Sequence, residues 1–237
     1  MVSEKKAMRH EIKYLISYAQ YMALRQRLKA VLDQDENMKG REDYFIRSVY
    51  LDDLHNSAYE DKISGVGDRK KYRIRIYDYD YDVIKLECKE KIGSKIHKES
   101  VRINRECCEQ IIHGNFEGLC DRTEPLCKEI YTRAHASGFR SVVIVDYDRE
   151  AYCYPVSNVR ITFDKRLHAG GVHSFDLGDK DLITLPVYLD QSVILEVKYD
   201  EVLPKFISQL LAMNYGASLS VSKYCICKDI LHLVNGK

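Results

Sequence analysis

The stretch KYRIRIYD, residues 71–78, decides how this sequence is expected to fold. Arg73 and Arg75 are two residues apart and alternate with Ile74 and Ile76. Side chains of an extended strand point alternately to its two faces, so both arginines would lie on one face and both isoleucines on the other. The sequence therefore predicts a strand with an apolar face that packs on a core and a cationic face.

The same alternation recurs in four other segments, residues 85–91, 98–103, 159–164 and 193–200. In each of them Lys, Arg or Glu alternates with an apolar residue. A single strand of this kind is most simply explained by a solvated outer face. Its repetition in five strands of a nearly neutral chain favours a closed barrel, in which the charges line the lumen and helices cover the outside.

Length and composition indicate one domain over residues 1–237. The chain has no linker rich in Pro, Gly or Ser and no internal repeat. Its formal net charge is only +1, which gives no reason to expect binding to nucleic acid or to an anionic membrane. Any electropositive site must therefore be local, and the sequence makes no prediction of the oligomeric state.

The cysteines and the N-terminal sequence indicate a soluble, cytoplasmic protein. The eight cysteines contain no CxxC pair and no zinc-ligand spacing, so we expect reduced thiols that are buried or without a chemical role. The N-terminal MVSEKKAMRHE lacks the apolar run of a signal peptide. No window approaches the roughly 18 apolar residues of a membrane span.

Periodicity and turn signals predict an α+β chain dominated by an antiparallel sheet. Strands are expected at 8–16, 44–53, 71–80, 83–91, 96–104, 141–153, 158–164 and 192–200. Helices are expected at 18–32, 54–63, 105–113, 123–137, 201–213 and 222–234, the fifth ending near Gly216. A tight acidic turn around Asp80 and Asp82 would join two strands, and residues 165–181 would be loop with some extended structure. Eight strands can form a barrel around a small ligand.

The cations expected on the inner face outnumber the acids there. They are Lys13, Arg73, Arg75, Lys89, Lys98, Arg149, Arg160, Lys198 and, from the last helix, Lys223. The acids expected with them are Glu11, Glu87 and Glu196. Removing unpaired charges from water costs several kcal/mol each, so the site should bind a ligand with several negative charges. Arginine and lysine both suit phosphate, and a linear phosphate chain fits a cylinder.

Other chemistries find no support in the sequence. It contains no GxxxxGK[ST] loop, no G-x-S-x-G elbow, no HExxH and no GxGxxG after a strand. An enzyme acting on phosphates would therefore depend on positioning and electrostatics rather than on a covalent nucleophile. Glu196 and Glu11 could hold a hard divalent cation, Mg²⁺ or Mn²⁺, that bridges phosphate oxygens.

Nine short motifs follow one another along the chain: EIKY (11–14), SVYLDD (48–53), KYRIRIYD (71–78), ECKEK (87–91), HKES (97–100), DYDREAY (146–152), VRITFD (159–164), LEVKYD (195–200) and SVSKY (220–224). In this order they resemble the VTC domain, a polyphosphate polymerase domain with stand-alone bacterial members. The VTC domain belongs to the triphosphate tunnel metalloenzyme (CYTH-like) superfamily. The resemblance covers residues 8–230. It implies an eight-stranded antiparallel tunnel that transfers the γ-phosphate of ATP to inorganic polyphosphate with Mn²⁺ or Mg²⁺.

The resemblance also implies a role for each matching residue. The catalytic cations would be Arg73, Arg75, Lys89 and Lys198. The other phosphate ligands would be Lys13, Lys98, Tyr147, Arg149, Arg160, Ser222 and Lys223. Glu196 would bind the metal, with Glu11 beside it.

One departure bears on the reaction. Triphosphatases and cyclases of the superfamily begin with E-x-E-x-K, whereas this chain has Arg9-x-Glu11-x-Lys13 and lacks one metal-binding acid. This favours a polymerase. Two alternatives stay open: a tripolyphosphatase or nucleoside triphosphatase that uses water as the acceptor, and a non-catalytic polyphosphate-binding module.

Overall fold

The computed structural model describes residues 9–93, 95–172, 175–213 and 221–234. Residue 8, where the first strand was expected to start, and Gly216, the expected helix end, lie outside these ranges. Within the described residues, no helix is long and apolar enough to cross a membrane.

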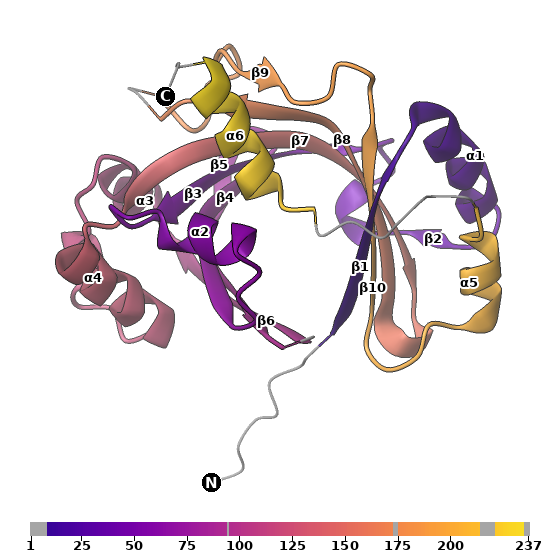
Figure 1. Ribbon diagram of the computed structural model, residues 1–237, viewed down its shortest axis with the longest axis horizontal. Coiled ribbons are helices and arrows are strands. Elements are labelled where there is room, and N and C mark those ends of the chain that lie inside the picture. The colour runs from indigo at the N-terminus through magenta and orange to yellow at the C-terminus, as the bar shows by residue number, and fades with distance from the viewer. Residues whose placement is uncertain (1–8, 94, 173–174, 214–220, 235–237) are drawn as a thin grey trace, which may run out of the picture.

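An antiparallel, strongly curved sheet of eight main strands organises the molecule (Figure 1). Its order is β1-β10-β8-β7-β3-β4-β5-β6, and the short β2 and β9 pair with β7 and β8. The main strands are β1 (His10–Ile16), β3 (Tyr44–Asp52), β4 (Arg69–Tyr77), β5 (Asp80–Ile92), β6 (Lys95–Ile103), β7 (Arg140–Tyr154), β8 (Val159–Gly170) and β10 (Val193–Tyr199). The expected α+β fold with eight antiparallel strands is confirmed.

The curved sheet closes only partly. Its edge strands β1 and β6 approach each other at one end, where a single bridge joins Arg9 to Ile96. Near this end Lys89 Nζ of β5 also lies 2.7 and 2.8 Å from the two carboxylate oxygens of Glu11 of β1. The sheet is therefore a half-barrel with a joined end rather than a fully hydrogen-bonded cylinder.

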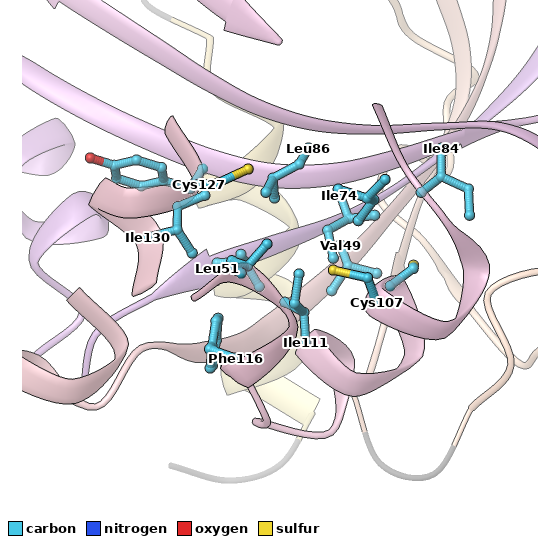
Figure 2. Close-up of a cluster of buried hydrophobic side chains, with 14 of the residues drawn as sticks. Val49, Leu51, Ile74, Ile84, Leu86, Cys107, Ile111, Phe116, Cys127 and Ile130 are labelled. Atoms are coloured by element: carbon cyan, nitrogen blue, oxygen red, sulfur yellow. The ribbon is translucent and has the colours of Figure 1, made fainter. Parts of the chain in front are cut away.

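The convex face of β3, β4 and β5 packs under α3 (Arg105–Ile112) and α4 (Pro125–Ser137). Figure 2 shows this cluster, in which strand residues such as Leu51 and Ile74 meet helix residues such as Ile111 and Ile130. These strand residues alternate with the charged ones, so their burial turns the charges toward the concave face. The apolar half of KYRIRIYD is thus what fixes the direction of its arginines.

The other half of the convex face packs under α1 (Tyr18–Lys29) and α5 (Lys205–Leu210). Ser17 begins α1 with a capping box, in which its hydroxyl accepts from the Gln20 N–H and the Gln20 side chain accepts from the Ser17 N–H. Leu24 and Leu28 of this helix are fully buried against the strands. This end of the expected helix 18–32 is correct, whereas its C-terminus comes three residues earlier.

Helix α6 (Lys223–Val234) differs from the outer helices because it packs on the concave side. Tyr224 stacks on Tyr50 of β3 with ring centroids 5.0 Å apart. Residues of α6 share a core cluster with inward-facing residues of β3, β7 and β8, and α6 also contacts α2 (Ser57–Ile63). The concave side is therefore apolar beneath α6 and charged beyond its N-terminus.

Three local expectations were wrong. β8 continues to Gly170, because the chain stays paired with β7 past a bulge at which Arg166 has φ of 49°. The turn between β4 and β5 is made by Asp78 and Tyr79, both with positive φ, rather than by the acids that follow. The helix expected over 201–213 is only the six residues of α5.

All eight cysteines are free thiols. Six are buried and belong to two of the core clusters, Cys153 is half-buried, and Cys120 is exposed. The buried six behave as small apolar side chains, as expected.

Candidate functional site

A cavity of about 700 Å³ lies on the concave face, at the end where β1 and β6 meet. Its lining contains fourteen lysine and arginine side chains and two glutamates. All thirteen residues proposed from the sequence line it, contributed by seven strands and by α6 with the residue before it. Sequence reasoning missed eight further lining residues, the apolar Ile96 and Val221 and six polar ones, which are Arg9, Tyr50, Lys62, Arg69, Lys71 and Lys91.

Glu87 of β5 anchors one cluster of cations. It is 1% exposed and accepts from Arg73 Nε at 2.8 Å, and Arg75 Nη1 lies 3.7 Å away. Lys98 of β6 also forms an ion pair with it. Burial opposes ionisation, but Arg73, Arg75 and Lys98 together hold the pKa of Glu87 well below its usual range. This carboxylate fixes the side chains of three cations on β4 and β6, the two strands that flank β5.

Glu11 and Glu196 anchor a second cluster across β1 and β10. The register places Lys13 opposite Glu196 and Glu11 opposite Lys198. Lys13 Nζ lies 2.9 Å from Glu11, and Lys198 pairs with Glu196. Burial and the negative charge of Glu196 act to raise the pKa of Glu11, but Lys89, Lys13 and Lys198 lower that pKa by more. The lysines likewise outweigh burial at Glu196, so both carboxylates are ionised.

Asp164 of β8 anchors a third cluster. Arg149 of β7 donates to it from Nε at 2.6 Å and from Nη2 at 2.8 Å, the two-pronged geometry that suits arginine. Lys223, the first residue of α6, pairs with the same carboxylate. Arg160 is held separately, by Asp35 at 2.8 Å and the Tyr44 hydroxyl at 3.2 Å.

Tyr147 and Ser222 supply neutral groups to the cavity. The Tyr147 hydroxyl accepts from Arg75 Nη2 at 3.0 Å, which leaves its own hydrogen available for an oxygen ligand. Burial would raise the pKa of Tyr147, but Arg149 and Arg75 outweigh it and lower that pKa. Ser222 precedes α6 and accepts from Lys71 Nζ at 2.7 Å.

Burial makes two lysines of the cavity less basic than an ordinary lysine. Burial, followed by repulsion from Lys13, lowers the pKa of Lys89 to about 7. Burial likewise lowers the pKa of Lys98 to about 8, although Glu87 beside it acts in the opposite direction. The lining itself holds fourteen cations and two glutamates, so the free cavity has an excess of positive charge. A polyanion would relieve that excess.

The missed lining residues differ in how they could have been found. Arg69, Lys71 and Lys91 continue the same strand alternation as the arginines of β4 and the lysines of β5, so the pattern itself contains them. Lys62 comes from α2, and only tertiary packing brings it to the cavity.

The donor set fits a small divalent cation that is bound together with phosphate. Among the described residues, no group of three or more His, Cys, Asp or Glu side chains gathers at one point. Mg²⁺ commonly takes one or two carboxylates and completes its shell with water and phosphate oxygens. Glu11 and Glu196 are two ionised oxygen donors of this kind, although each already pairs with lysines.

The VTC domain matches residues 8–232, nearly the whole chain. The chain belongs to the VTC domain family. The family resemblance inferred from the nine motifs is thereby confirmed. No protein with a curated description matches this VTC domain significantly in sequence.

One of the similar solved structures supports the fold. A protein of Bacillus halodurans described as a candidate adenylate cyclase is 8% identical and has a TM-score of 0.52, over 90% of this chain and 95% of its own. A protein of Vibrio parahaemolyticus with the same description is 10% identical with a TM-score of 0.45, over 86% and 83%. At such low identity, the first likeness supports a common fold only.

Proposed function

We propose that this VTC domain is a metal-dependent polyphosphate polymerase, which converts ATP and polyphosphate of n phosphates into ADP and polyphosphate of n+1. The observation that carries the proposal is the half-closed cavity with fourteen cationic side chains and two glutamates, in a member of the VTC domain family. Only a ligand with many regularly spaced negative charges would neutralise such a lining along its length.

The reaction breaks the bond between the γ-phosphorus and the oxygen that stays on ADP. A terminal oxygen of the polyphosphate forms the new P–O–P bond. Arg73, Arg75, Lys89 and Lys198 would stabilise the charge that spreads over the transferred group and the leaving oxygen. The carboxylates Glu87, Glu11 and Glu196 hold these cations in place before substrate arrives, so little reorganisation is needed.

The remaining predicted residues would bind the phosphates that do not react. These are Lys13, Lys98, Tyr147, Arg149, Arg160, Ser222 and Lys223. Glu196 and Glu11 would hold Mg²⁺ or Mn²⁺, which supplies Lewis-acid polarisation of phosphate oxygens. Neither the ion nor a residue acts as a covalent nucleophile in this proposal.

Incubation with ATP and Mn²⁺, followed by gel analysis of chain length, tests the proposal. A ladder of long phosphate chains is the expected result, and Arg75→Gln should abolish it. Arg75 is a better target than Arg73, because Arg73 lies closer to Glu87. Loss of Arg73 would leave that buried carboxylate without its nearest arginine. Lys29→Gln, an exposed cation on α1, is the matched control and should synthesise normally.

Two other outcomes would contradict a polymerase. Release of orthophosphate without any ladder would identify a hydrolase that uses water as the acceptor. Tight binding of ATP without turnover, with no reaction rate that Glu196→Gln changes, would identify a binding module.

A further inference from the structure

The cations of the cavity fall into two groups according to what faces them. The deeper ones share the buried carboxylates Glu87 and Asp164, or the pair on β1 and β10. Arg9 and Arg160 pair with acids of their own, Asp200 and Asp35. Arg69, Lys71 and Lys91 lie toward the end where β1 and β6 meet. In the described part of the chain, no ion pair joins Arg69, Lys71 or Lys91 to an acid.

The strand register sharpens this contrast. Arg69 lies directly opposite Lys91, and Lys71 lies opposite Lys89, on the same inward face. Like charges opposite each other destabilise a sheet. One step deeper, Arg73 lies opposite Glu87, which is a favourable pair. The next pair, Arg75 opposite Lys85, is again of like charge, but Arg75 also faces Glu87 and Lys85 does not line the cavity. The pairs of β4 and β5 in which both cations line the cavity therefore lie at one end of it.

Lys71 is the central member of this group. Its Nζ donates to the Ser222 hydroxyl at 2.7 Å and lies 3.8 Å from Cys225 Sγ, and neither partner is a carboxylate. Burial lowers the pKa of Lys71 to about 8; Cys225 acts in the opposite direction, and the nearby cations Lys13 and Arg69 lower the pKa. The side chain is thus placed and partly dehydrated without a carboxylate beside it.

The length of the cationic row exceeds what three phosphates require. Arg69 and Arg75 are six residues apart on one strand, which corresponds to roughly 20 Å. Arg69 and Lys91 also border a neighbouring hollow, which is lined besides them by five acids and two cations, Lys70 and Arg133. The acids are Asp52, Asp53, Asp61, Asp68 and Glu90. Because they outnumber those two cations, phosphate should bind on the cavity side of Arg69 and Lys91.

We propose that Arg69, Lys71 and Lys91 form an outer subsite that binds the non-reacting phosphates of a long polyphosphate and makes the protein prefer long chains to tripolyphosphate. This deepens the proposed function, since it assigns part of the same cavity to chain length. It concerns binding alone, so it can be tested without any turnover.

Calorimetric titration with tripolyphosphate and with long-chain sodium polyphosphate provides the test. The wild type should bind the long chain more tightly. Arg69→Gln combined with Lys71→Gln should lower the ratio of long-chain to tripolyphosphate affinity about tenfold or more, because each lost charge-assisted contact is worth about that factor. Arg75→Gln should weaken both ligands and leave the ratio unchanged.

The double variant Lys29→Gln with Lys128→Gln removes the same charge from exposed positions of α1 and α4 and should leave the ratio at its wild-type value. Because the outer subsite brings like charges together, its double variant should also melt at a higher temperature than the wild type when no anion is present. If that double variant fails to fold, Lys71→Gln alone carries the same comparison.

Equal affinity of the wild type for both ligands would overturn the outer subsite, as would an unchanged ratio in its variants. Absence of polyphosphate synthesis would overturn only the proposed reaction, because the affinity ratio is measured without it.

Discussion

At the scale of single residues, Glu87 is the carboxylate on which the cationic arrangement of β4 and β5 depends. Glu87→Gln would leave Arg73 largely buried without an opposite charge. Because removal of one partner of a buried ion pair leaves an uncompensated charge, we expect the free energy of unfolding to fall by about 3 kcal/mol. Urea denaturation without anions measures this.

The exposed pair Arg105–Glu109 gives the matched control. Glu109→Gln should leave the urea midpoint unchanged, since exposed ion pairs contribute little. Addition of tripolyphosphate should recover part of the loss in Glu87→Gln, because phosphate replaces the missing negative charge. Equal urea midpoints for Glu87→Gln and the wild type would show that Glu87 is not needed to hold these cations.

Lys89 should make phosphate binding depend on pH. Its pKa of about 7 in the free protein lies below that of an ordinary lysine, and bound phosphate would raise it. At pH 8 the group is then mostly neutral before binding and protonated after it, so binding takes up a proton and affinity falls as the pH rises above 7.

Lys89→Arg keeps the charge but cannot titrate in this range. Titrations with tripolyphosphate at pH 8, in buffers of different ionisation enthalpy, should therefore show fewer protons taken up by Lys89→Arg than by the wild type. Equal proton uptake would mean that Lys89 is already charged in the free protein.

At the scale of elements, α6 is held by a polar contact as well as by its apolar face. The Tyr224 hydroxyl donates to Asp52 of β3, and the same carboxylate accepts from the backbone N–H groups of Ala58 and Tyr59 in α2. One buried acid thus joins a strand and two helices. Tyr224→Phe should lower the free energy of unfolding by about 1–3 kcal/mol, since Asp52 loses a donor.

The same substitution should also weaken tripolyphosphate binding, because α6 carries Lys223 to the cavity and begins just after Ser222. Tyr18→Phe, on an exposed tyrosine of α1, is the control for the loss of a hydroxyl and should change neither quantity. If Tyr224→Phe bound tripolyphosphate as the wild type does, the position of α6 would not depend on this contact.

At the scale of the whole molecule, phosphate should be a stabilising ligand. The excess of cations in the cavity opposes folding, and a polyanion that binds only the folded state removes it. Tripolyphosphate at about 100 times its dissociation constant should stabilise the protein by about 2.7 kcal/mol and raise its melting temperature. No rise in a thermal scan would argue against an anion-binding cavity.

Divalent metal should bind well only together with phosphate. Glu11 and Glu196 already pair with lysines, so a cation must displace ammonium groups unless phosphate takes them over. Electron paramagnetic resonance of free Mn²⁺ should show little uptake by the protein alone and uptake of Mn²⁺ when tripolyphosphate is present. Tripolyphosphate binds some Mn²⁺ without the protein, and this amount is subtracted. The remaining uptake should be smaller for Glu196→Gln than for the wild type.

The sequence determined the strands and the direction of their side chains. Alternation of two is a local property of an extended chain, so the inward direction of Arg73 and Arg75 followed from Ile74 and Ile76 alone. The N-terminus of α1 was also set locally, because Ser17 caps the helix. The bulge at Arg166 and the left-handed turn at Asp78 were missed, because neither position carries a glycine and their conformations come from strand pairing.

Only the tertiary structure decided which charges meet. Lys89 and Glu11 are far apart in sequence and come together because the edge strands of the curved sheet approach each other. It also placed α6 on the concave face and brought Lys62 to the cavity. Among the residues that the structure describes, it left Arg69, Lys71 and Lys91 without an ion pair to an acid. The physical reason is range: strand alternation is set between neighbours in the chain, whereas ion pairing depends on sheet curvature and on packing across the whole molecule.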